Sequence, residues 1–163
     1  VALVREYCGD LMKMLSAKGQ DRGVIFGIGD PVPSLAEFCR SYSQALRTVD
    51  LASRICDERI ATYRRYILCE LIYDSPNAKL ALIQRIKPLL AYDEEHNTQL
   101  LYTLETYFNN CQNSVKTSKA LFIHRNTLLY RLDRIAEILD LNYNDSEQML
   151  TFQLALKAFL MCQ

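Results

Sequence analysis

Hydrophobic residues recur along most of this chain at the three- and four-residue spacing of amphipathic helices. In the N-terminal third, this spacing predicts a helix over residues 3–18 and another from a candidate cap at Ser34 to about residue 54. From Asp57 onward the pattern is helical throughout, so we expect a mainly α-helical fold. The helices predicted there span residues 58–74, 78–91, 96–110, 114–122, 125–139 and 146–162, with breaks at 75–77, 92–94 and 142–145.

One segment has the pattern of a strand. Residues 23–30, GVIFGIGD, are a short apolar run that ends in glycines and Asp30-Pro31. A single strand needs partners for its backbone groups. We therefore interpret residues 1–56 as the C-terminal part of an α/β domain whose other strands lie outside this chain or come from a second chain. Residues 57–163 are interpreted as a separate helical domain, and the start at Val1 predicts that the chain is a piece of a longer protein.

Composition and charge narrow the classes of function. The 163 residues carry 19 basic and 19 acidic side chains, so a site for a polyanion must be a local patch. The six cysteines form no C-x-x-C pair and only two histidines are present, which predicts reduced core cysteines and no metal site. The sequence has neither a signal peptide nor an apolar run of about twenty residues. We expect a cytoplasmic protein with no membrane segment and no cofactor.

The side chains best suited to binding lie in ALFIHRNTLLYRLDRI, residues 120–135. On a helix over 125–139, apolar side chains share one arc and polar side chains occupy the opposite one. Ile123 precedes this helix as an apolar plug, and His124 or Asn126 is a candidate N-cap. The shorter helix before it is predicted to turn Val115, Ser118 and Leu121 inward. The apolar arc contains Leu128, Leu129, Leu132, Ile135, Ala136 and Leu139.

This arrangement predicts a helix-turn-helix that binds double-stranded DNA. Five basic residues and one acidic residue lie between positions 113 and 134, a net of four positive charges in a neutral chain. The amides at the start of the second helix favour phosphate, and arginine or asparagine can contact base edges in pairs of hydrogen bonds. We expect base contacts from His124, Arg125 and Asn126, with Thr127 and Tyr130 near bases or phosphates. Backbone contacts are expected from Lys116, Thr117, Lys119, Arg131 and Arg134.

The same residues resemble the C-terminal helix-turn-helix domain of PucR-type transcriptional regulators, a bacterial family that includes purine-catabolism and sugar-diacid regulators. The resemblance covers roughly residues 70–163 and implies sequence-specific transcription regulation. Two departures are Thr117-Ser118, where alanines are common, and Phe122, where a small turn residue is common in helix-turn-helix motifs. The matching positions are Tyr92-Asp93, Thr103-Leu104, Tyr107, Ala120-Leu121, His124 to Leu128, Tyr130 to Leu132 and Arg134-Ile135.

Residues 24–54 are similar to the end of the GGDEF-like domain that precedes the helix-turn-helix in such regulators. They combine a V-x-x-G-I-G run with Ser41-Tyr42 and Ala45-Leu46 in the following helix. No G-G-D-E-F sequence is present, so the resemblance implies no cyclase chemistry. It does imply that a small-molecule effector is bound by an N-terminal sensor domain absent from this chain.

Other interpretations of the sequence remain. Gly27-Ile28-Gly29 could form a nucleotide loop, but Asp30-Pro31 interrupts the run into a helix, which favours a strand-end turn. The acidic run Asp93–Glu95 with His96 could be a catalytic or metal cluster, although a solvated helix start explains it better. No catalytic set has motif support, and we expect no enzyme.

The competing function is a helical protein-interaction or dimerisation module. The final helix is apolar around much of its circumference, so it must be buried in the domain or against a partner. Dimerisation would also place two recognition helices in successive major grooves, and we therefore expect a homodimer. The apolar residues of this helix are Met149, Leu150, Phe152, Leu154, Leu156, Phe159 and Leu160.

Overall fold

The computed structural model describes residues 1–55 and 58–162, and most of these residues are helical. Internal contacts divide the chain into an N-terminal unit, Val1–Ser75 with the last residues from Leu160, and a C-terminal unit, Pro76–Phe159. The mainly α-helical fold expected from the sequence is confirmed. The division into family domains at residues 56 and 57 stays a prediction.

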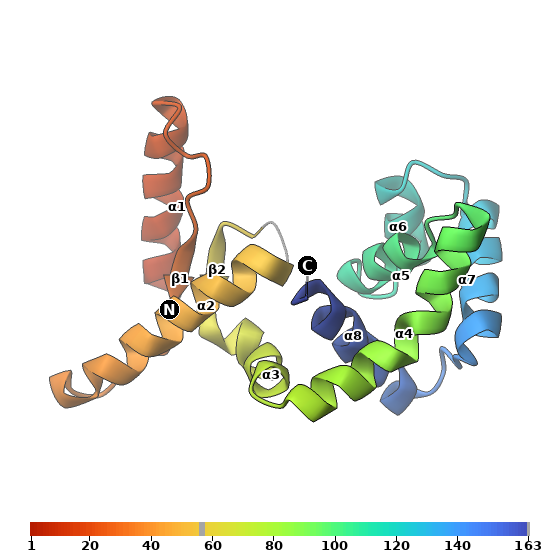
Figure 1. Ribbon diagram of the computed structural model, residues 1–163. Coiled ribbons are helices and arrows are strands. Elements are labelled where there is room, and N and C mark those ends of the chain that lie inside the picture. The colour runs from red at the N-terminus through yellow and green to blue at the C-terminus, as the bar shows by residue number, and fades with distance from the viewer. Residues whose placement is uncertain (56–57, 163) are drawn as a thin grey trace. The chain divides into compact units, whose positions relative to one another are not determined.

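The N-terminal unit contains a short parallel pair of strands crossed by a helix (Figure 1). Strand β1 (Phe26–Ile28) pairs with β2 (Ile60–Thr62), with Phe26 opposite Ile60 and Ile28 opposite Thr62. The remaining elements are α1 (Ala2–Ala17), the 3-10 turn η1 (Leu35–Glu37), α2 (Phe38–Ile55) and α3 (Tyr63–Tyr73). The prediction of a helix over residues 60–62 was wrong, because these residues form β2. Within residues 1–55 and 58–162, β1 therefore has one partner strand.

Gly27 in β1 and Gly29 just after it allow α2 to approach the strand closely. A Cβ on Gly27 would lie 2.3 Å from the Ala45 carbonyl oxygen, and one on Gly29 would lie 2.1 Å from that of Ser41. Hydrogen bonds also hold α2 against the end of the strand. The Ser41 hydroxyl donates to the Asp30 carbonyl over 2.7 Å. The Asp30 amide in turn donates to Gln44 Oε1 over 2.9 Å. The G-I-G run is therefore a packing feature between strand and helix.

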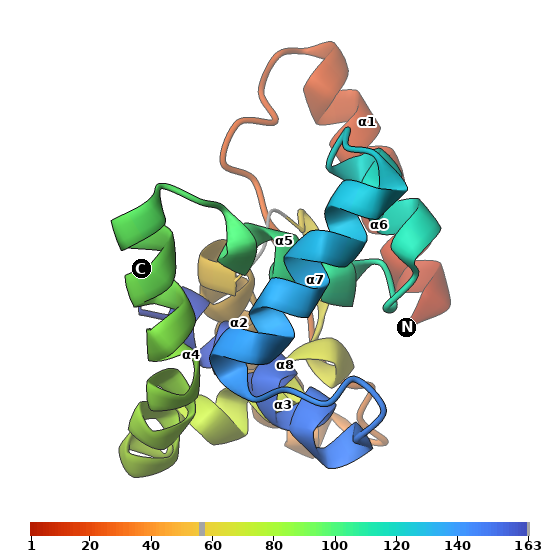
Figure 2. The ribbon, with the colours of Figure 1, turned by 90° about the vertical axis from the view of Figure 1, so that its right-hand side faces the viewer.

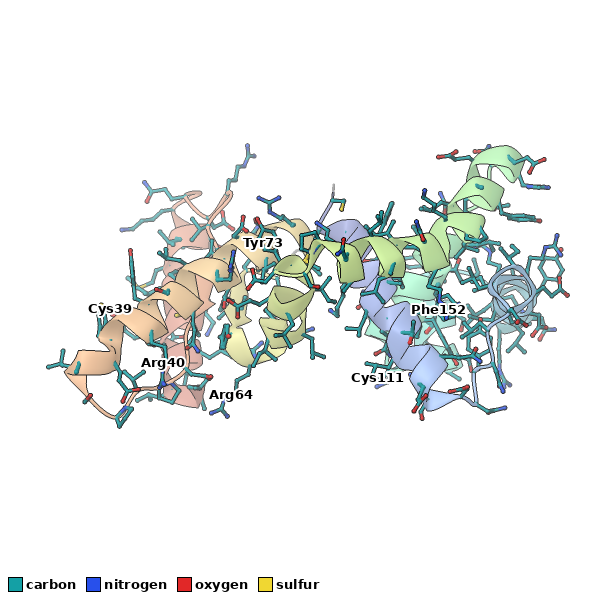
Figure 3. The ribbon with its side chains drawn as sticks, turned by 60° about the horizontal axis from the view of Figure 1, so that its bottom comes forward. Cys39, Arg40, Arg64, Tyr73, Cys111 and Phe152 are labelled. Atoms are coloured by element: carbon teal, nitrogen blue, oxygen red, sulfur yellow. The ribbon has the colours of Figure 1, made fainter. Side chains whose placement is uncertain are left out.

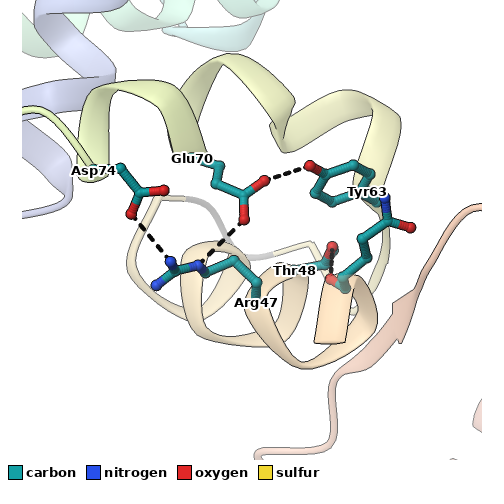
Figure 4. Close-up of polar contacts among 6 residues, drawn as sticks. Arg47, Thr48, Tyr63, Glu70 and Asp74 are labelled. Carbon is teal, nitrogen blue, oxygen red and sulfur yellow. Dashed lines mark hydrogen bonds and ion pairs between the residues drawn. The ribbon is translucent and has the colours of Figure 1, made fainter. Parts of the chain in front are cut away.

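A polar cluster joins α2 to α3 (Figure 4). Arg47 pairs with Glu70 over 3.4 Å and with Asp74 over 3.0 Å. The Tyr63 hydroxyl donates to the Glu70 carboxylate. Glu70 is therefore held between Tyr63 and Arg47. The positive charge of Arg47 is therefore neutralised by two carboxylates of the same unit.

The predicted apolar side of the helix around residues 34–54 is only partly covered. The buried residues of α2 are Thr48, Leu51, Ala52 and Ile55, all in its C-terminal half. In contrast, Leu35 is 90% exposed, and Phe38, Tyr42 and Leu46 are each more than half exposed. The sequence pattern found the helix but did not show which part of its apolar side is buried in this unit.

The C-terminal unit is a helical domain with a continuous hydrophobic core. Its helices are α4 (Pro76–His96), α5 (Leu100–Asn109), α6 (Ser114–Ala120), α7 (Arg125–Leu139) and α8 (Ser146–Leu160). Met149, Phe152 and Leu156 of α8 are buried in this core, whereas Leu150 is half exposed. The last helix is therefore buried mainly inside the domain, one of the two alternatives expected from the sequence, and Leu150 lies on its exposed side.

The predicted break at residues 92–94 lies inside α4. The chain instead turns at Asn97, whose φ is 51°, and Asp93 reaches across that turn. Its carboxylate accepts hydrogen bonds from the amides of Leu100 and Leu101, over 2.8 Å and 2.9 Å. Asp93 therefore caps α5 rather than starting a helix of its own.

Cysteine positions differ from the expected core role. Cys8 and Cys69 are buried, but Cys39 and Cys111, labelled in Figure 3, and Cys162 are exposed. Cys56 lies outside the described residues. Cys8, Cys39, Cys111 and Cys162 are free thiols. Among the described residues there is no group of His, Cys, Asp and Glu arranged to hold a metal ion, and no helix long and apolar enough to cross a membrane.

Candidate nucleic-acid interface

The first helix of the predicted motif, α6, begins with a side-chain cap. Asn113 Oδ1 accepts from the amides of Val115 and Lys116, over 3.1 Å and 3.0 Å, which satisfies two amides that have no partner within the helix. Lys116 and Lys119 are exposed on this helix, whereas Val115 is half exposed rather than turned inward as predicted.

Thr117 is completely buried, and its hydroxyl donates to the Asn113 carbonyl over 2.8 Å. The adjacent Ser118 is also buried. The predicted contact of the Thr117 side chain with the DNA backbone therefore does not fit this structure, because the side chain is part of the interior of the helix pair.

The turn between α6 and α7 is held by two backbone hydrogen bonds. The Ile123 amide donates to the Ser118 carbonyl over 3.0 Å, and the Phe122 amide donates to that of Lys119 over 3.2 Å. This pair of bonds forms a Schellman motif, in which the residue at the position of Phe122 adopts a left-handed conformation. Phe122 has φ 54° and is 95% exposed, while Ile123 packs against the core as the predicted plug.

The second helix, α7, has the predicted bounds, Arg125–Leu139. His124 is its N-cap, and Nδ1 of that ring accepts from the Asn126 amide over 3.2 Å. Because Nδ1 is the acceptor, the neutral ring carries its proton on Nε2, where it is a donor. The predicted arc is buried at Leu128, Leu132, Ile135 and Leu139, but Leu129 lies at its edge and is 40% exposed.

The predicted contact residues of α7 fall into two groups. His124, Arg125, Asn126, Thr127 and Tyr130 are exposed on the cap and first two turns, with α6 beside the start of α7 (Figure 2). Further along the helix, Asp133 and Glu137 are exposed as well. Their charge opposes phosphate, so the surface suited to a polyanion is limited to the N-terminal end of α7.

Arg131 and Arg134 connect α7 to other helices. Arg131 Nη1 donates to the Thr103 hydroxyl of α5 over 3.2 Å. Arg134 pairs with Glu137 over 2.6 Å, and its guanidinium lies 4.9 Å from the centre of the Tyr92 ring of α4. Both arginines are engaged within the domain, and their contact with DNA stays a prediction. In contrast, within the described part of the chain Lys116, Lys119 and Arg125 form no ion pair.

Tyr143, in the loop after α7, supports the middle of that helix. Its hydroxyl donates to the Leu132 carbonyl over 2.9 Å, and its ring meets that of Tyr107 edge to face, 5.8 Å between centres. Burial raises the pKa of Tyr143 above its ordinary value. The phenol therefore remains a hydrogen-bond donor at neutral pH.

Sequence reasoning missed several residues that shape this surface. Asn113 could have been found from the rule that asparagine before a helical run is a strong cap. Asp93 could not, because its capped amides lie seven and eight residues further along the chain. Phe122 was noticed only as a departure at a turn position, and no sequence signal predicted its exposure.

Comparisons with known proteins agree with this geometry. Residues 100–158 match the model of the PucR C-terminal helix-turn-helix domain. The carbohydrate diacid regulator of Escherichia coli K12 is 30% identical over 131 residues, which cover 80% of this chain and 34% of that protein. In Bacillus subtilis 168, the proline-responsive transcriptional activator PutR is 32% identical over 134 residues, covering 75% of this chain and 31% of that protein.

The DNA-binding transcriptional activator AdeR of the same Bacillus strain is 28% identical over 162 residues, covering 94% of this chain and 38% of that protein. The chain therefore spans about a third of the length of the curated relatives it matches. Similarity to these relatives reaches well beyond residues 100–158 into the N-terminal unit. The assignment of the N-terminal residues to the end of a GGDEF-like domain stays a prediction.

Proposed function

We propose that the chain is the DNA-binding part of a bacterial transcriptional regulator, a proposal supported by the match of residues 100–158 to the model of the PucR C-terminal helix-turn-helix domain. The N-terminal turns of α7 enter the major groove and bind a specific sequence. The relatives that match are named as regulators, and we infer that this chain likewise acts by binding rather than by catalysis.

The observation that carries this proposal is the set of cations without carboxylate partners at one end of the motif. Lys116, Lys119 and Arg125 have no ion pair among the described residues, and they flank the start of α7. Helix N-termini favour anions, so the helix and the side chains attract phosphate at the same place. The acidic residues further along α7 restrict binding to this end.

We assign different tasks to the exposed residues. Arg125, Asn126 and the His124 Nε2 donor contact base edges, while Thr127 and Tyr130 lie near bases or phosphates. Lys116 and Lys119 contact the backbone and position the helix. Arg131 and Arg134 act through their contacts with α5 and α4 and reach phosphate only at the border of the interface.

We further propose that the regulator acts as a homodimer and that a small-molecule effector is bound outside residues 1–163. One helix-turn-helix contacts few base pairs, and two-fold related copies increase affinity and specificity. Residues 1–56 are then the end of a GGDEF-like domain, in which α2 packs on β1 through Gly27 and Gly29. A strict monomer in solution, both with and without its DNA site, would contradict the dimer.

A second candidate function is protein interaction through the N-terminal unit. Leu35, Phe38, Tyr42 and Leu46 are exposed along η1 and α2, and the Phe38 and Tyr42 rings stack 6.0 Å apart. This surface favours contact with another part of the regulator or with a partner. It is compatible with DNA binding by the C-terminal unit.

The proposed function is tested by selecting genomic DNA fragments with the purified chain and sequencing them. Arg125→Ala should cost about 1–3 kcal/mol of binding and relax the preference at one base pair. Arg64→Ala is the matched control, because Arg64 is exposed but pairs with Asp30 in the N-terminal unit, and it should select the same site as the unmodified chain. Fragments no different from bulk DNA would favour the interaction module.

A further inference from the structure

Phe122 is the most exposed of the large hydrophobic side chains in the described residues, at 95%. It lies at the αL position of the Schellman motif, with φ 54°, where glycine is the usual residue. Its two neighbours supply the apolar contacts of the turn, because Leu121 and Ile123 both pack against the core. The packing of the domain therefore does not require an aromatic side chain at this position.

The position of Phe122 joins it to the proposed interface. It follows Lys119 by three residues and precedes the His124 cap by two. Two backbone hydrogen bonds, from the Phe122 and Ile123 amides, hold this turn in place. The ring is thus presented between two sets of side chains that are proposed to contact DNA.

Duplex DNA offers few apolar groups to such a ring. Base faces are stacked on one another, and the phosphates form a charged surface along the backbone. In the major groove, the 5-methyl group of thymine is the apolar feature that a phenylalanine can contact. The Phe122 ring lies between Lys119 and Arg125 in the chain, both proposed to contact DNA, and is therefore suited to pack against this methyl group.

We propose that Phe122 packs against the 5-methyl group of one thymine at the edge of the site bound by α7, and so determines the preference for thymine there. This inference rests on the proposed function of the helix-turn-helix. The contact discriminates thymine from cytosine, and it also discriminates thymine from uracil, which differs from thymine only by the methyl group. It adds an apolar determinant to the polar contacts of Arg125 and Asn126.

The test combines methyl deletion in the DNA with ring deletion in the protein. Each thymine of the selected site is replaced singly by deoxyuridine, and affinities are measured for the unmodified chain and for Phe122→Ala. For the unmodified chain, one replacement should weaken binding about fourfold, the effect of one buried methyl group. For Phe122→Ala, the same replacement should have no effect, and its affinity for the unmodified site should already be lower.

Two further variants separate contact from folding. Phe122→Gly keeps a residue that favours the left-handed turn and should lose the same thymine preference. Leu150→Ala removes an apolar side chain of α8 that is 50% exposed, and should retain the response of the unmodified chain to every deoxyuridine. Circular dichroism confirms that each variant is folded.

Each outcome supports or overturns the inference. Deoxyuridine effects on affinity that are equal for the unmodified chain and Phe122→Ala at every position would overturn it. A loss of affinity with Phe122→Ala that is the same for every DNA sequence would also overturn it. If a specific site is selected and Arg125→Ala loses it, such results reject only the role of Phe122. If the unmodified chain selects no site, the proposed function fails and this inference fails with it.

Discussion

The N-terminal unit and the helix-turn-helix both carry cationic side chains on their surfaces, but the N-terminal unit neutralises most of its own. Even Arg64, whose side chain is 72% exposed, pairs with Asp30 over 3.0 Å. Lys116, Lys119 and Arg125 have no such partner in the described parts of the chain. The pairs of the N-terminal unit include Arg5 and Arg65 with Glu58, Arg40 with Glu37, Arg54 with Asp50 and Arg59 with Asp21.

This difference shows why counting basic residues identifies an interface poorly. Exposed ion pairs contribute little to stability, but each pair cancels the attraction of its cation for a distant anion. What distinguishes α6 and the start of α7 is therefore the lack of carboxylate partners for Lys116, Lys119 and Arg125, rather than a greater number of cations. The neutral net charge of the chain conceals this local imbalance.

The two regions also differ in how they use special backbone positions. Gly27 and Gly29 have no left-handed φ, and they are required because α2 lies against them. Phe122 has a left-handed φ and open surroundings, yet it is not glycine. The N-terminal positions serve packing, whereas the turn position retains a side chain that packing does not need.

The largest effect is expected where the helix lies against the strand. Gly29→Ala places a methyl group against the Ser41 carbonyl, which should lower the free energy of unfolding by about 3 kcal/mol. Urea denaturation measures the change. Gly9→Ala is the control, since a Cβ at that position in α1 has no atom within 4 Å. It should raise the free energy of unfolding by about 0.5–1 kcal/mol, and a similar loss in both variants would refute the close-packing explanation.

A somewhat smaller effect is expected from the unpaired lysines. Replacing Lys116 and Lys119 together by alanine should lower DNA affinity about tenfold per lysine at 0.1 M salt, and reduce the slope of log affinity against log salt by about 1.8. The loss should be similar for all DNA sequences. Titrations at several salt concentrations measure it, with Arg64→Ala as the control. A slope that changes as much for Arg64→Ala would remove the distinction between paired and unpaired cations.

The smallest effect concerns the turn itself. Phe122→Gly should raise the free energy of unfolding by less than about 1 kcal/mol, because relief of the left-handed strain is partly offset by the greater freedom of glycine in the unfolded chain. Thermal denaturation measures this gain. Gly19→Ala makes the opposite change at another left-handed position, φ 66° with open surroundings, and should destabilise. A gain in stability for Gly19→Ala would show that φ alone does not decide whether a substitution raises or lowers the free energy of unfolding.

The sequence was most informative where local signals agreed. The bounds of α7 were predicted correctly because a capping residue, helical periodicity and a polar start coincide there. Strand β2 was missed because three residues, Ile60-Ala61-Thr62, are too short to break a helical pattern. Their conformation depends on pairing with β1, more than thirty residues earlier in the chain.

Within the candidate interface, the direction of individual side chains was the harder problem. Thr117 is polar by type, yet it is buried because its hydroxyl bonds to the Asn113 carbonyl. Arg134 lies on the polar side of α7, but the ring of Tyr92, 42 residues earlier, holds its guanidinium. These orientations depend on tertiary contacts that residue type and spacing do not encode.

The buried phenol of Tyr143 makes the C-terminal unit a proton-linked system at alkaline pH. Because burial raises its pKa, the folded state keeps the proton at pH values where an unfolded chain releases it. Above the ordinary tyrosine pKa of about 10, unfolding is therefore accompanied by proton release, and the free energy of unfolding falls as the pH rises. Ten tyrosines contribute to the absorbance of tyrosinate, so the difference between the unmodified chain and Tyr143→Phe isolates this coupling. Tyr143→Phe should weaken the pH dependence.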